Sequence, residues 1–181
     1  MKKLLLGSAL LALTLLSCST EQGMTEQPIK LSELVNTGCK RSFSPKESRS
    51  DFYRTEMEVK PKVSILVDKN GVADFKVTDL KENCIVSEFR PTVKVNGEEL
   101  IVVLIPYATD PTVEADCYCR YDVGFKVSNI LQGKCILRIY ISNYFGEYNT
   151  ENPIYEGWLT FAPNHSFGFE LLKISIAFTF Y

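Results

Sequence analysis

Short stretches in which apolar and polar residues alternate are the feature that most constrains how this chain can fold. Val63, Ile65 and Val67 alternate with mostly polar neighbours, and the same two-residue period returns at residues 73–77, 121–127 and 135–141. This period places every second side chain on one face of an extended strand. Outside the first 17 residues, no long window follows the helical period. The pattern therefore predicts an all-β protein.

Turn-forming residues divide these stretches into hairpins. Asn70-Gly71 and Asn96-Gly97 suit tight turns that need positive φ, and each is flanked by strand-like sequence. The six residues 100–105 are all apolar, which predicts a strand covered on both faces. Residues 155–161 and 167–180 supply two or three further strands, the last of which is expected to pair inside a sheet. About eight short strands predict one antiparallel, immunoglobulin-like β-sandwich over residues 32–181.

The first 17 residues have the pattern of a secretory signal. Two lysines precede a mostly apolar run over residues 4–16, which is too short to span a membrane as a helix. Leu15-Leu16-Ser17-Cys18 resembles a bacterial lipobox, in which cleavage before the cysteine is followed by its lipidation. Two or more acyl chains, such as palmitate, anchor a protein stably. The pattern predicts a lipoprotein anchored at Cys18; the alternative is an ordinary signal peptide with an incidental cysteine.

The residues after Cys18 bear on location. Ser19 stands where many inner-membrane lipoproteins carry aspartate, so the outer membrane is the predicted location. Glu21 lies near the predicted anchor, and acidic residues there favour export to the cell surface in some bacterial lineages. Whether the protein faces the periplasm or the cell surface therefore stays open. Residues 18–31 are polar and without period, which predicts the lipidated cysteine followed by a flexible tether. A short helix within residues 29–36 is a further alternative.

The cysteines predict two disulfides. Cys117 and Cys119 are two residues apart, so in a strand both point to the same face, and a bridge between them would be strained. Because an exported chain is in an oxidising compartment, each is expected to pair with Cys39 or Cys84. Which cysteine pairs with which stays open. Cys135 lies on the apolar side of an alternating stretch, which predicts a free buried thiol.

Two cysteine segments resemble a known group of proteins. Residues 117–122 read Cys-Tyr-Cys-Arg-Tyr-Asp, and Thr37-Gly38-Cys39-Lys40 follows the tether. This arrangement resembles small lipoproteins of Bacteroides-type bacteria that carry a Cys-x-Cys-x-Tyr-Asp core, a following strand and a short glycine turn. The resemblance covers roughly residues 37–142, and Cys84 fits it. It implies an envelope location and a fold rather than an activity.

Several functional classes find little support in the sequence. With 20 basic and 22 acidic residues, the chain lacks the positive charge expected of a nucleic-acid-binding protein. His165 is the only histidine and lies in a turn-rich hairpin loop, and no G-x-S-x-G motif is present to supply a serine nucleophile. Cys117-Tyr118-Cys119 precedes a strand rather than opening a helix, which disfavours redox catalysis. No metal or other cofactor is expected.

The segment 140–158 is the one stretch that looks like a binding surface. It combines aromatic residues with asparagines, a mixture that suits sugar rings or protein partners; the candidate binding residues are Tyr144, Phe145, Tyr148 and Trp158. The alternative is a long hairpin whose aromatic residues cap the sandwich. The sequence thus predicts a lipid-anchored, non-enzymatic binding or structural module of the cell envelope. A small glycan-directed hydrolase with unidentified carboxylates is the second hypothesis.

Overall fold

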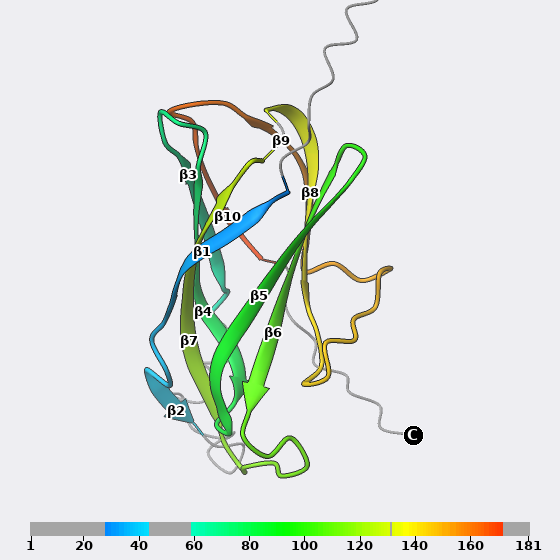
Figure 1. Ribbon diagram of the computed structural model, residues 1–181. Helices are drawn as coiled ribbons and strands as arrows, with labels where there is room; N and C mark the ends of the chain where they lie inside the picture. The colour runs from blue at the N-terminus through cyan, green and yellow to red at the C-terminus, as the bar shows by residue number, and fades with distance from the viewer. Residues whose placement is uncertain (1–27, 44–58, 131, 172–181) are drawn as a thin grey trace, which may run out of the picture.

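The computed structural model describes residues 28–43, 59–130 and 132–171, which form a sandwich of two β-sheets (Figure 1). The predicted signal, Cys18 and most of the tether lie outside the described residues, as does the expected strand end over 172–181. Within the described ranges, no helix has the length and apolar character needed to cross a membrane. The all-β sandwich predicted from the alternation is confirmed.

The first sheet has six strands, all paired antiparallel, in the order β1-β7-β4-β3-β10, with β2 also paired to β7. Its strands are β1 (Lys30–Asn36), β2 (Arg41–Phe43), β3 (Lys62–Val67), β4 (Ala73–Asn83), β7 (Tyr118–Ser128) and β10 (Ser166–Glu170). β4 and β7 are the long central pair of this sheet. These two strands carry Asp79, Glu82, Cys119 and Asp122.

The second sheet has four strands in the order β5-β6-β8-β9. They are β5 (Val86–Asn96), β6 (Glu99–Ala108), β8 (Gly133–Ile141) and β9 (Tyr155–Phe161). The expectation of a wholly antiparallel fold is wrong at one place, because β6 and β8 pair in parallel. Between them the chain crosses to the other sheet to form β7 and returns, and a parallel pair requires such a crossover.

The core lies between the sheets and follows the predicted alternation. On the six-stranded sheet Phe75 stacks on Phe125, with ring centres 5.1 Å apart. Across the interior, Phe89 of β5 meets Tyr121 of β7 edge to face at 5.6 Å. Burying each large apolar side chain stabilises the fold by about 1.5–3 kcal/mol. The cluster is continuous from one sheet to the other and includes Cys135.

The N-terminal part of the domain differs from the expectation. Lys30 already belongs to β1, so the sheet begins before the predicted tether end at residue 31, and residues 29–36 do not form a short helix. A helix of this length has little stability on its own, whereas pairing with β7 satisfies the hydrogen-bonding groups of the backbone. The Asn36 amide donates to the Phe89 carbonyl at 3.1 Å and accepts from the Phe89 N–H at 2.7 Å. This side chain links the edge strands of the two sheets.

One strand contains a proline, and the hairpin loop expected around His165 does not join paired strands. Residues 86–92 form the first half of β5, although Pro91 lies among them. The proline is tolerated because β5 is an edge strand, where one N–H of each pair of residues needs no partner. Residues 162–165 do not close a hairpin: β9 pairs with β8 and β10 pairs with β3, so this loop connects the two sheets.

Candidate functional site

The four aromatic residues predicted to form a binding surface differ in their exposure to solvent. Phe145 and Trp158 are 75% and 52% exposed. Tyr148 is half-buried and packs on Tyr140, with ring centres 4.7 Å apart. Tyr144 is half-buried against the core, and burial raises the pKa of its hydroxyl above the ordinary value. Two of the four therefore remain available to a partner, while the other two serve mainly in packing.

The outer face of the four-stranded sheet carries more apolar surface than the sequence segment alone suggested. Along β6, Leu100, Val102 and Leu104 face the core, so the residues between them face outward. Together with β8, β9 and the connection 142–154, which lies on this side of the sheet (Figure 1), they form what we call the aromatic face. Its exposed or half-buried apolar members are Ile101, Ile105, Tyr107, Ile136, Phe145 and Trp158.

Charged side chains flank the aromatic face. Arg138 on β8 makes ion pairs of 2.8 Å with Glu99 on β6 and with Glu156 on β9. Lys134 places its Nζ 4.6 Å from the ring centre of Trp158, which stays half exposed with the lysine in place. An aromatic ring bordered by such donors and acceptors can stack on an apolar ring face and hydrogen-bond its substituents. The aromatic face is suited to binding. Of its apolar members, the sequence pointed only to Phe145 and Trp158.

A groove lies on the side of the molecule opposite the aromatic face and was not predicted. It is a shallow, open groove of about 510 Å³ on the six-stranded sheet, over β3, β4 and β10. Its lining includes Lys62, Ser64, Lys76, Thr78, Gly168 and Glu170. Gly168 presents no side chain opposite Ser64, which keeps the floor of the groove low. In the sequence, this surface was indicated by the polar residues that alternate with apolar residues in the predicted strands.

The structure contains two disulfides and answers the question of pairing. Cys39 is bonded to Cys119, and Cys84 is bonded to Cys117. Cys135 is free, as predicted, with 4% of its surface exposed. Burial raises the pKa of its thiol, which disfavours the reactive thiolate.

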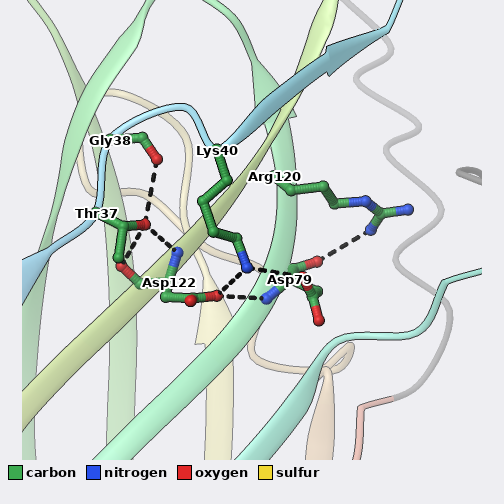
Figure 2. Close-up of polar contacts among 6 residues, drawn as sticks. All are labelled: Thr37, Gly38, Lys40, Asp79, Arg120 and Asp122. Carbon is green, nitrogen blue, oxygen red and sulfur yellow. Dashed lines mark hydrogen bonds and ion pairs between the residues drawn. The ribbon is translucent and has the colours of Figure 1, made fainter.

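A polar network beside the first disulfide was not anticipated. Figure 2 shows Lys40 between two carboxylates, with Nζ 2.6 Å from Asp122 and 2.8 Å from Asp79. Burial alone would lower the pKa of Lys40, but the hydrogen bonds and charges of Asp122 and Asp79 outweigh it and raise the pKa. The same Asp122 oxygen accepts the Asp79 N–H at 3.0 Å, and Arg120 donates to the Asp79 carbonyl at 3.0 Å.

This network holds an irregularity in β4. Asp79 has φ of +59°, a left-handed conformation that is uncommon outside glycine, and the pairing of β4 with β7 shifts register between Val77 and Leu80. The shift reverses which residues face inward. Ala73, Phe75 and Val77 point into the core before it, whereas Leu80 and Glu82 are buried after it. The groups in Figure 2 therefore have a structural role in setting the phase of the strand.

The consequence is a buried acid that sequence reasoning missed. Glu82 is 4% exposed and lies opposite Cys119 in the strand pairing. Its Oε1 accepts the Asn83 N–H at 2.9 Å, and burial raises its pKa to about 7. Extending the alternation of residues 73–77 would have placed Glu82 in solvent. The available signal was Leu80, an apolar residue in the polar phase of that alternation.

The turn predicted at Asn70-Gly71 is present between β3 and β4, and His165 lies in a loop. Asp68 accepts the N–H groups of Asn70 and Val72 at 2.8 and 2.9 Å, as expected for a hairpin turn. His165 is exposed in the loop between the sheets, with its Nδ1 3.3 Å from the Thr160 carbonyl. Within the described part of the chain, no three His, Cys, Asp or Glu side chains are grouped to hold a metal ion.

No family model, curated protein or solved structure matches this chain.

Proposed function

We propose that this chain is a lipoprotein of the outer membrane, anchored through acylated Cys18, whose β-sandwich is a non-enzymatic binding module. The signal-like residues 1–17 and the lipobox-like Leu15-Leu16-Ser17-Cys18 support the anchor. The resemblance of the cysteine segments to Bacteroides-type lipoproteins points the same way. The polar residues after Cys18 are long enough to hold the sandwich away from the membrane surface.

The aromatic face is the proposed binding surface, and a glycan is the ligand class it fits best. The observation that carries this choice is Trp158, a large aromatic residue that is 52% exposed on the outward side of an edge strand. Its neighbours Lys134 and Arg138 supply hydrogen-bond donors, and Glu156 supplies acceptors. Aromatic faces next to polar groups suit the apolar faces and hydroxyl groups of sugar rings.

A glycan array with a soluble form beginning at Ser19 tests the binding surface. We expect Trp158→Ala to weaken binding at least about tenfold, because exposed tryptophans are frequent energetic centres of interfaces. Leu66→Ala is the matched control, since Leu66 is 56% exposed on the other sheet and is expected to leave binding unchanged. Equal binding by the wild type and Trp158→Ala would contradict the assignment. Release of cleaved sugar would favour the hydrolase instead.

The anchor is tested independently of the ligand. The mass of the mature protein should correspond to a chain that begins at an acylated Cys18, and Cys18→Ala should move the protein from the outer-membrane fraction to the soluble fraction. Protease added to intact cells should digest the sandwich if it faces the outside. A mature protein without lipid, or one recovered with the inner membrane, would contradict the proposal.

A further inference from the structure

The two disulfides form one continuous group of sulfur atoms. The Sγ of Cys119, bonded to Cys39, lies 3.2 Å from the Sγ of Cys84, which is bonded to Cys117. Neither sulfur carries a proton in the bonded state, so this is a direct contact between two disulfides. A thiolate formed at Cys119 would be within reach of a second disulfide without a change of fold.

The strand pairing explains why the sulfur atoms meet. Glu82 lies opposite Cys119, and the Cys84 N–H donates to the Cys117 carbonyl at 3.1 Å, so Cys84 lies beside Cys117 one step further along. In an antiparallel pair, the direct and diagonal neighbours on one face are both within reach of long side chains. Cys84 therefore has Cys117 as its direct partner and Cys119 as its diagonal partner.

Solvent reaches the two disulfides unequally. Cys39 is exposed in the connection between β1 and β2, whereas Cys119 is 1% exposed inside the sandwich. Cys84 and Cys117 are half-buried. Thiol–disulfide exchange depends on access to the sulfur that is attacked. An external thiolate is thus expected to attack Cys39 and to leave the electron pair on Cys119.

We propose that Cys39, Cys119, Cys84 and Cys117 form a thiol–disulfide relay. Attack by a thiol at exposed Cys39 produces a free thiol at Cys117. A small-molecule thiolate attacks Cys39; its bond to that sulfur forms, the Cys39–Cys119 bond breaks, and Cys119 becomes a thiolate. Cys119 then attacks Cys84, the Cys84–Cys119 bond forms, and the Cys84–Cys117 bond breaks. Cys117 leaves as a thiolate and takes a proton from water.

The relay changes which part of the chain is covalently held. Before exchange, Cys117 ties the end of the connection between β6 and β7 to Cys84. After exchange, Cys84 is tied to Cys119 within β7, and Cys39 carries the external thiol as a mixed disulfide. A reducing signal at the surface would thereby release the connection 109–117.

Limited reduction of the mature wild-type protein tests the relay. The protein is exposed to reduced glutathione, trapped with an alkylating reagent, and mapped by proteolysis at low pH and mass spectrometry. We expect glutathione on Cys39, a new Cys84–Cys119 bond, and at least about tenfold more alkylation on Cys117 than on buried Cys119. Cys135, which is buried, serves as the internal reporter, because its alkylation marks unfolded molecules.

Four results would overturn the relay: alkylation mainly on Cys119, alkylation on Cys39, opening of Cys84–Cys117 with Cys39–Cys119 intact, or survival of both original bonds. A variant with Cys84→Ser and Cys117→Ser removes the acceptor disulfide, so the free thiol should stay on buried Cys119 and be alkylated only by a second reagent added after unfolding. In Cys39→Ser the thiol is present from the start, and the Cys84–Cys119 bond should form without glutathione. Cys84–Cys117 as the sole bond in that folded variant would also count against the relay.

Discussion

Replacing Glu82 with glutamine should remove a pH-dependent loss of stability. The side chain is 4% exposed, and burial raises its pKa from an ordinary 4.5 to about 7. Nearby charges act more weakly: Lys81 lowers this pKa and Glu114 raises it. Below pH 4.5 the carboxyl is protonated in the folded and the unfolded chain, so its titration does not affect the equilibrium.

The sign follows from proton binding. As the pH rises above 4.5, the unfolded chain releases this proton while the folded chain retains it, so the free energy of unfolding falls until the pH passes about 7. The gap between the two pKa values corresponds to about 3 kcal/mol. Glutamine keeps an oxygen that can accept the Asn83 N–H but carries no titrating proton.

The assay is thermal unfolding at pH 5 and pH 8 with the disulfides intact. The melting temperature of Glu82→Gln, relative to that of the wild type, should rise by about 6–12 °C between the two pH values for a chain of this size. Glu98→Gln, in the exposed turn between β5 and β6, is the matched control and should show no such change. A constant difference between the wild type and Glu82→Gln at both pH values would refute the reasoning.

Three further substitutions test the structure. Asn36→Ala removes the side chain that bonds both backbone groups of Phe89, and should lower the free energy of unfolding in urea by about 1–3 kcal/mol with an unchanged denaturant slope. Tyr121→Phe removes the hydroxyl whose one proton is shared between the carbonyls of Asn83 and Val86, at 3.0 and 2.9 Å, and should cost about 1–2 kcal/mol. Asp122→Ala should cost about 1–3 kcal/mol and expose the Asp79 amide to hydrogen exchange; unchanged exchange there would show that the bulge does not depend on Asp122.

The alternation predicted most of the strands because the physical cause is local. Every second residue along β3 and β7 is buried, and that pattern can be read without knowing the partner strand. β1 and β2 were missed because they are edge strands with little buried surface, and are formed mainly by backbone bonds to β7. The parallel pairing of β6 with β8 depends on chain crossovers, which leave no local pattern.

The candidate sites also divide into those set by the local sequence and those set by the pairing of distant strands. Cys135 was predicted as a free buried thiol, since its neighbours in the sequence already show which face it occupies. Glu82 was missed because its burial depends on a register shift that is held by Asp122 of β7 and by Lys40 of the connection between β1 and β2. Trp158 was identified as a candidate, but its outward neighbour Ile136 becomes visible only through the pairing of β8 with β9.

The bond between Cys39 and Cys119 limits how the domain responds to mechanical force. A pull on the chain before β1, such as the proposed anchor would transmit, acts first on the hydrogen bond from the Asn129 side chain to the Pro28 carbonyl and then on the pair Lys30 and Ser128, and peels β1 from β7 one residue at a time. Peeling stops at Cys39, because this residue is covalently attached to β7. The nine residues 30–38 released by then extend the tether by about 30 Å. Up to that length the strand acts as a reversible extension, and beyond it the load passes through the disulfide directly to the centre of the six-stranded sheet.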